Sequence, residues 1–224
     1  MIEKEQKIYW VAFDVASEKL DVAAGDQWHS KPQWSAPNVP NKERNLKNCL
    51  EMAKKKADEA GQTLRLVCES TGVYHRELER CAAEMNIPIC IVPPSRVHNF
   101  AKCEGEQEKT DAADAALIRR YAMLYSPRIT PYDPDRYMLQ EKVSLRIQLA
   151  NDLAQYKARL QTTRDETTAK FVRAQIEHLE EQCTLIEKEI EAFLALRAAI
   201  DPRIERLRAK KGIGTLTLGV LMAY

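Results

Sequence analysis

Short apolar runs alternate with amphipathic stretches over the first 125 residues of the chain. The run KIYWVAFDV, residues 7–15, is rich in β-branched and aromatic residues and predicts a buried strand that ends near Asp14. A second run, LRLVC, predicts a buried strand that leads directly into Glu69. The whole pattern predicts strands over 7–15, 19–24, 27–34, 64–68 and 87–92, and helices over 42–60, 73–86, 95–103 and 111–125.

This order indicates an α/β fold with a mixed sheet and flanking helices. A hairpin followed by β-α-β-α is the order expected of a ribonuclease-H-like domain. We expect this domain to occupy 1–126, and prolines at 127, 131 and 134 predict a linker over 127–136.

The hydrophobic period changes after the linker. Residues 137–199 contain no Gly and no Pro, and apolar residues recur at intervals of four and three, as in a coiled coil. The polar segment TTRDETTAK breaks the phase, which predicts a coiled-coil helical hairpin over 137–200 joined near 162–169. One continuous helix with a phase slip is the alternative. Because the seam is narrow, we expect the hairpin to form a homo-oligomer; packing within one chain is the other interpretation.

The last segment, 201–224, is predicted to start a further domain. Its 203–211 portion has five basic residues and one acidic residue. The following Gly-Ile-Gly is typical of a helix-hairpin-helix, in which glycines let backbone amides approach a phosphate. The chain ends at Tyr224 inside a predicted helix, so we expect this domain to be incomplete. The nucleic-acid-binding candidates here are Arg208, Lys210, Lys211, Gly212 and Gly214.

Composition narrows the functional classes. The chain has 34 basic and 33 acidic residues and a net charge of +1, so nucleic-acid binding must rest on local patches. Six cysteines without a CxxC pair favour reduced core thiols. No apolar run is long enough for a membrane span, and the N-terminus has no signal-like segment. We therefore expect a soluble cytoplasmic protein without membrane contact.

Four carboxylates occupy the ends of predicted elements. Asp111 and Asp114 are three residues apart, which places both on one face of a helix. Asp14 and Glu69 follow buried strands, where α/β proteins gather their chemistry. Four such carboxylates bind two Mg²⁺ or Mn²⁺ ions, which activate water in the hydrolysis of a phosphodiester. Each has a plainer explanation: helix capping for the Asp pair, a turn for Asp14 and simple exposure for Glu69. Their joint occurrence favours the metal site.

Basic residues beside these carboxylates are candidates for phosphate contact. Arg96, His98 and Lys102 follow a strand end, although a solvated helix face is the default interpretation. Lys109 can contact the scissile phosphate or pair with Asp111. The isolated histidines, His29, His75 and His178, are expected at the surface.

Four motifs in order carry a family resemblance. The segments FDVASEKLDVA, ESTGVYHREL, IVPPSRVHNFAK and KTDAADAALIRRYA closely resemble motifs of the DEDD transposases of bacterial insertion sequences, which include the Piv-type DNA invertases. The resemblance covers 7–125 well and the hairpin more weakly. It implies a RuvC-like catalytic domain that binds Mg²⁺ through Asp14, Glu69, Asp111 and Asp114. It also implies DNA as substrate, a structured guide RNA in some members, multimeric assembly and a nucleoid-associated bacterial protein.

The resemblance leaves three functions to compare. The first is a metal-dependent transposase or site-specific recombinase that cleaves and transfers DNA strands. The second is a recombination-incompetent module that binds DNA or RNA and oligomerises. This is considered because family members use a C-terminal serine nucleophile, and no serine of this chain lies in a matching context. The third is a RuvC-like junction nuclease, against which the long coiled coil and the Gly-Ile-Gly segment argue.

Overall fold

The computed structural model describes residues 7–28, 31–70, 72–105 and 111–224. The chain divides into two compact units, Met1–Tyr132 and Asp133–Tyr224. Each unit has its own core, and the two are described separately below.

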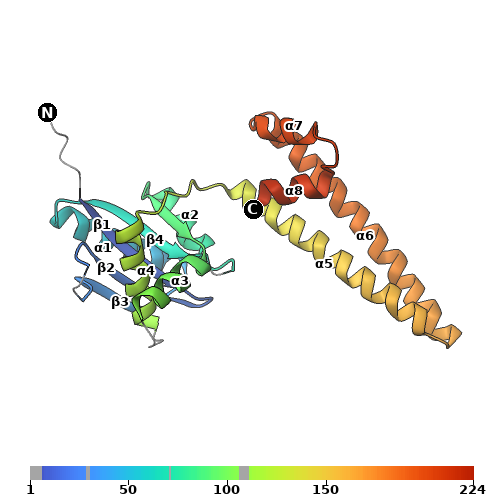
Figure 1. Ribbon diagram of the computed structural model, residues 1–224, viewed down its shortest axis with the longest axis horizontal. Helices are drawn as coiled ribbons and strands as arrows, with labels where there is room; N and C mark the ends of the chain where they lie inside the picture. The colour runs from blue at the N-terminus through green and yellow to red at the C-terminus, as the bar shows by residue number, and fades with distance from the viewer. Residues whose placement is uncertain (1–6, 29–30, 71, 106–110) are drawn as a thin grey trace. The chain divides into compact units, whose positions relative to one another are not determined.

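The first unit is built on a five-stranded mixed sheet with strand order β3-β2-β1-β4-β5 (Figure 1). β1 pairs antiparallel with β2 and parallel with β4, and β4 pairs parallel with β5. The strands are β1 Ile8–Val15, β2 Lys19–Gly25, β3 Trp34–Pro40, β4 Thr63–Glu69 and β5 Ile89–Val92. This topology is ribonuclease-H-like, as the order of elements in the sequence predicted.

The third strand lies further along the chain than its sequence pattern suggested. The strand predicted over 27–34 is wrong, because β3 begins at Trp34 and pairs antiparallel with β2. Pro37 and Pro40 lie within β3, which is at the edge of the sheet. Proline is tolerated on an edge strand because the missing N–H costs no ladder hydrogen bond on the solvent side.

Two layers of helices cover the sheet, and the two-residue period of the strands assigns each side chain to one face. One face carries Phe13 and Cys68 and packs against α1 Glu43–Glu59 and α2 Arg76–Glu84. The other face carries Trp10, Ala12 and Val67 and packs against α3 Pro94–Glu104 and α4 Asp111–Tyr125. Figure 1 shows α4 lying across the sheet.

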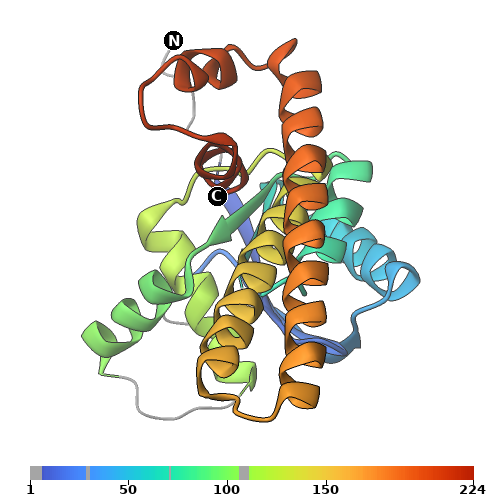
Figure 2. The same cartoon turned by 90° about the vertical axis from the view of Figure 1, so that its right-hand side faces the viewer.

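The second unit is a helical hairpin followed by two short helices. α5 Pro134–Thr162 and α6 Glu166–Ala198 are joined by a three-residue connection over 163–165 and lie side by side (Figure 2). Buried residues of both helices meet along the seam, among them Leu149, Leu179 and Cys183. This is the two-helix hairpin of the prediction rather than one continuous helix.

The base of the hairpin holds the two short helices, α7 Pro202–Arg208 and α8 Thr215–Ala223. Its core joins residues of all four helices: Leu139, Val143, Ile190, Leu194, Ile204, Leu218 and Ala223. Gly219 on α8 allows the close packing, because a Cβ there would lie 3.1 Å from a methyl carbon of Ile190 and of Val143.

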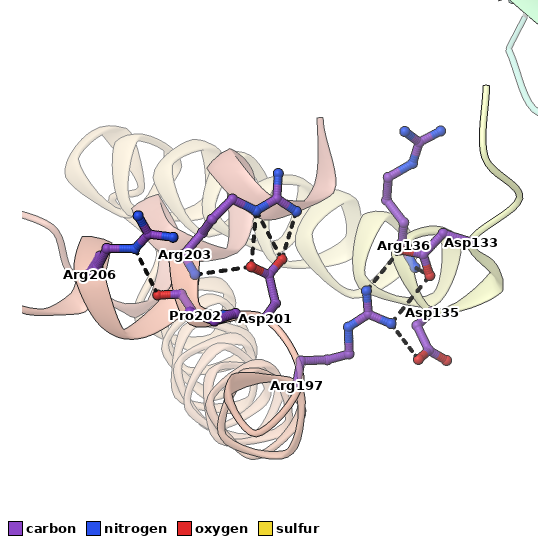
Figure 3. Close-up of polar contacts among 8 residues, drawn as sticks. All are labelled: Asp133, Asp135, Arg136, Arg197, Asp201, Pro202, Arg203 and Arg206. Carbon is purple, nitrogen blue, oxygen red and sulfur yellow. Dashed lines mark hydrogen bonds and ion pairs between the residues drawn. The ribbon is translucent and has the colours of Figure 1, made fainter. Parts of the chain in front are cut away.

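An arginine connects the two ends of the hairpin at this base. Arg197 of α6 forms ion pairs of 2.8 Å with Asp133 and 2.6 Å with Asp135 at the start of α5 (Figure 3). Asp133 also caps α5 by accepting the backbone N–H of Arg136. Proline at position 202 begins α7, with Asp201 as its N-cap, because proline fits the first turn of a helix. No helix in the described part of the chain is long and apolar enough to cross a membrane.

Candidate functional site

Asp14 and Glu69 lie at the same end of two neighbouring strands. Phe13 of β1 is the register partner of Cys68 of β4, and Asp14 and Glu69 are the next residues of each strand. Successive side chains of a strand point to opposite faces of the sheet, and Phe13 and Cys68 lie on the face covered by α1 and α2. Asp14 and Glu69 therefore lie on the other face, which α3 and α4 cover. Both are half-buried. The parallel register therefore brings together two carboxylates that are separated by 54 intervening residues in the sequence.

The first turns of α4 place Asp114 toward the same face. Leu117 and Ile118 are buried against the sheet, and Asp114 precedes them by three and four residues, on the same stripe of the helix. Asp114 is half-buried. Asp111 is the first residue of α4, but its side chain lies outside the described residues, and so does Lys109. The structure thus describes three of the four predicted carboxylates.

Asp14 and Asp114 are both close enough to Glu69 to influence it electrostatically. Burial raises the pKa of Glu69 above its ordinary 4.5, and the negative charges of Asp14 and Asp114 raise it further. The neighbouring thiol of Cys68 is fully buried on the opposite face, where burial raises its pKa. The site consequently offers hard oxygen donors and no thiolate from Cys68.

This donor chemistry fits Mg²⁺ or Mn²⁺, which prefer carboxylate oxygen ligands. Among the described residues, however, no group of three or more His, Cys, Asp or Glu is close enough to hold a metal ion. The side chain of Asp111, the fourth predicted ligand, lies outside the described residues. The metal site stays a prediction that rests on the shared location and the charge coupling of Asp14, Glu69 and Asp114.

A further carboxylate, Asp21, lies beside this site and was not predicted from the sequence. Asp21 of β2 is the direct cross-strand partner of Asp14 and is 6% exposed. Its Oδ1 accepts the backbone N–H of Asn38 at 2.8 Å, where the β2–β3 register shifts. Asn38 has a φ of +55°, in the left-handed region. Asp21 therefore stabilises the irregular pairing of the edge strand, and only the cross-strand register could have revealed it.

The predicted basic patch lies on α3, which packs on the same face as α4. Arg96, His98 and Lys102 are all exposed. Val97 and Phe100, between them in sequence, are buried and fix the orientation of the helix. The three basic side chains therefore face solvent, as both a phosphate-binding patch and an ordinary helix surface require.

The basic residues of the second unit differ from one another in their surroundings. Arg208 forms ion pairs with Glu191 at 2.8 Å and Glu205 at 2.9 Å. Lys210 and Lys211 are exposed, and no ion pair involves them within the described ranges.

The turn that follows these lysines leads into α8. Gly212 has a φ of +91°, which favours glycine, and Gly214 is the N-cap of α8 without a side-chain cap. This geometry leaves the first amides of α8 without a side-chain acceptor from the N-cap.

One histidine of the first unit differs from its prediction. The prediction that His75 is a surface residue is wrong, because it is 6% exposed at the start of α2. His178 is exposed as predicted, and His29 lies outside the described residues. A lone histidine after a Gly-containing turn gives no local signal of burial; the packing of α2 on the sheet determines it.

Comparison with known proteins identifies the family of this chain. A model of the IS110-type DEDD transposases, described as a transposase, matches residues 11–168. The pilin gene-inverting proteins of Moraxella bovis and Moraxella lacunata are each 29% identical over 169 residues, which cover 71% of this chain and 50% of each relative. The chain thus spans about half the length of the curated relatives it matches.

Two solved structures are also similar to part of the chain. The RuvC structure of Thermus thermophilus and its complex with a Holliday junction substrate each align with 55% of this chain and 99% of their own, at 10% identity. Their TM-scores are 0.38 and 0.40. The ribonuclease-H-like fold is assigned from the strand order of the sheet. Because the family model spans well over half of the sequence, the chain belongs to the IS110-type DEDD transposase family.

Proposed function

We propose that this chain acts as a metal-dependent DNA transposase or site-specific recombinase, with the cleavage site formed by Asp14, Glu69, Asp111 and Asp114. The observation that carries the proposal is the location of Asp14, Glu69 and Asp114 on one face of the sheet, with the pKa of Glu69 raised by burial and by the other two charges. Family membership supports the same function.

Each residue has a defined part in this proposal. The four carboxylates would hold Mg²⁺ or Mn²⁺, which would supply activation of water and stabilisation of the leaving oxygen at a DNA phosphodiester. Glu69 would gain from a nearby cation, because burial and the charges of Asp14 and Asp114 disfavour its ionised form. Arg96, His98 and Lys102 would contact the DNA backbone from α3.

The metal site is testable with two aspartates that face each other across β1 and β2. Asp14→Asn is expected to abolish Mn²⁺ binding, because it removes a ligand and its charge. Asp21→Asn is the matched control, since Asp21 is directly opposite but accepts the Asn38 amide, which an asparagine can still accept. Isothermal titration of Mn²⁺ into each variant measures the difference. Unchanged Mn²⁺ binding in Asp14→Asn contradicts the metal site.

We further propose that the α7–turn–α8 segment contacts nucleic acid, either element DNA or a structured guide RNA. The exposed Lys210 and Lys211, the left-handed Gly212 and the Gly214 N-cap support this role. Arg208 is committed to Glu191 and Glu205, so we expect it to contribute less to phosphate binding than its sequence context suggested.

Salt-dependent binding separates these basic residues. The double variant Lys210→Ala, Lys211→Ala is expected to reduce the slope of log K against log salt by about 1.8 for duplex DNA, because each lost phosphate contact contributes about 0.9. Arg208→Ala serves as the comparison and is expected to leave the slope nearly unchanged. Fluorescence anisotropy with a labelled duplex and a labelled hairpin RNA measures both. A slope reduced by Arg208→Ala and not by the double variant refutes this assignment.

Assembly through the α5–α6 hairpin completes the proposal. The hairpin exposes large apolar side chains outside its own seam, among them Leu145, Leu185 and Leu196. A second copy of the chain that covers them would form the homo-oligomer expected from the heptad pattern. In this proposal the protein acts on DNA in the bacterial cytoplasm, close to the nucleoid.

A further inference from the structure

One asparagine connects the two chain segments that follow Asp14 and Glu69. Asn41 lies between β3 and α1, and its Nδ2 donates hydrogen bonds to the carbonyl oxygen of Ala16 at 3.1 Å and to that of Tyr74 at 3.0 Å. Ala16 is two residues after Asp14, and Tyr74 is five residues after Glu69. A single amide group therefore joins the backbone behind both strand ends.

The main chain of Asn41 is itself attached to one of these segments. Its backbone N–H donates to the carbonyl oxygen of Glu18 at 2.8 Å, in the turn that connects β1 and β2. The side chain is thus anchored on the β1–β2 turn and extends to the turn before α2. Both acceptors are carbonyl oxygens, and each takes one of the two N–H groups of the Asn41 amide nitrogen.

We infer that Asn41 is a positioning residue that sets the separation of the strand ends carrying Asp14 and Glu69. The inference rests on the proposed metal-dependent function for its consequence, but the connection itself is independent of metal. The register pairing of β1 with β4 ends at Phe13 and Cys68. Beyond these two residues, the Asn41 amide connects the segments that follow β1 and β4. Metal ligands need such a connection, because small displacements of a ligand lower the affinity for the metal.

Two variants test the role of the amide. Asn41→Ala removes both hydrogen bonds and keeps the backbone N–H. Asn41→Asp keeps the shape but presents a carboxylate, which cannot donate when ionised, to two carbonyl oxygens. Asn48→Ala, at an exposed position on α1, is the matched control for the loss of an asparagine side chain. Ala57→Gly, buried at the far end of α1, is the control for general destabilisation.

Hydrogen exchange without metal is the first measurement. The Ala16 N–H donates to Lys19 O, and the Arg76 N–H donates to Val73 O, so each amide reports on one of the two turns. Asn41→Ala and Asn41→Asp are expected to accelerate exchange at both amides, whereas Asn48→Ala changes neither. Acceleration in only one turn, or in neither, overturns the inference. Equal acceleration in Ala57→Gly also overturns it, because the effect then reflects stability alone.

Mn²⁺ titration is the second measurement, made well below the unfolding temperature of every variant. Asn41→Ala is expected to weaken Mn²⁺ binding about tenfold or more, as loss of ligand-supporting groups generally does. Asn48→Ala and Ala57→Gly are expected to retain the native affinity. Native affinity in Asn41→Ala overturns the positioning role. If the unmodified protein does not bind Mn²⁺, the proposed metal-dependent function is wrong. In that case the hydrogen-exchange result by itself decides whether Asn41 connects the two turns.

Discussion

Replacing Glu69 by glutamine is expected to abolish Mn²⁺ binding and DNA strand cleavage while raising the stability of the metal-free protein. The loss of cleavage should reach at least about 10²-fold, as for other groups that stabilise charge in a reaction centre. The gain arises because the Glu69 carboxylate is half-buried beside the charges of Asp14 and Asp114, and glutamine removes that repulsion. After solvent screening it should be less than about 1 kcal/mol, or at most about 2–4 °C in Tm.

The gain has a defined pH dependence. The pKa of Glu69 is raised above 4.5 in the folded protein. The protonated Glu69 side chain therefore contributes its full stability below pH 4.5, and this contribution is lost as the pH rises through the pKa that Glu69 has in the folded protein. The difference in Tm between Glu69→Gln and the unmodified protein should therefore be small near pH 4 and should grow toward neutral pH.

Differential scanning calorimetry across this pH range, with and without Mn²⁺, checks the prediction, together with nicking of a supercoiled plasmid. Glu51→Gln is the matched control, because Glu51 is exposed on α1, which covers the opposite face of the sheet. It should preserve the Mn²⁺-dependent rise in Tm that Glu69→Gln loses. A lower Tm for metal-free Glu69→Gln contradicts the proposed charge repulsion of Glu69 with Asp14 and Asp114.

Leu194→Ala is expected to destabilise the second unit by about 2–5 kcal/mol. Leu194 is 0% exposed in the core that joins α5, α6, α7 and α8. Truncation leaves a cavity between these helices, and the close packing of Gly219 against Ile190 and Val143 limits how far α8 can move to fill it. Hydrogen exchange of the α6 amides measures the change in this unit specifically.

Leu196→Ala is the control two residues away on the same helix. Leu196 is 77% exposed, so its truncation should change the stability of the chain by no more than about 0.5 kcal/mol. Sedimentation of both variants also shows whether Leu196 lies in the interface of the proposed homo-oligomer. If it does, truncating it to alanine should weaken assembly. Equal destabilisation by the two substitutions contradicts the core described for this unit.

Sequence periodicity was sufficient for most of the fold. The apolar run 7–15 and the shorter run before Glu69 became β1 and β4. Both runs are short and rich in β-branched, aromatic or other apolar residues, which favours a buried strand over a helix. The three- and four-residue intervals after 137 became the α5–α6 hairpin, and the polar break near 162–169 became its connection. The family resemblance read from four motifs was confirmed by the family model.

Local patterns failed where partners far apart in sequence decide the outcome. The Pro-containing segment of β3 resembles a loop, and only its antiparallel pairing with β2 makes it a strand. The burial of His75 depends on how α2 packs on the sheet. Arg208 was grouped with its basic neighbours, yet its ion pair with Glu191 sets it apart from Lys210.

Except at β3, the sequence by itself determined the types of element and their order, and it placed Asp14 and Glu69 at strand ends, because these features depend on side-chain period within a few residues. The tertiary structure alone decided which carboxylates share a face. It placed Asp114 beside that pair, committed Asp21 to the edge strand, and brought Asn41 between two distant turns. The physical reason is that register and helix packing fix contacts between segments, and no single window of sequence contains both partners of such a contact.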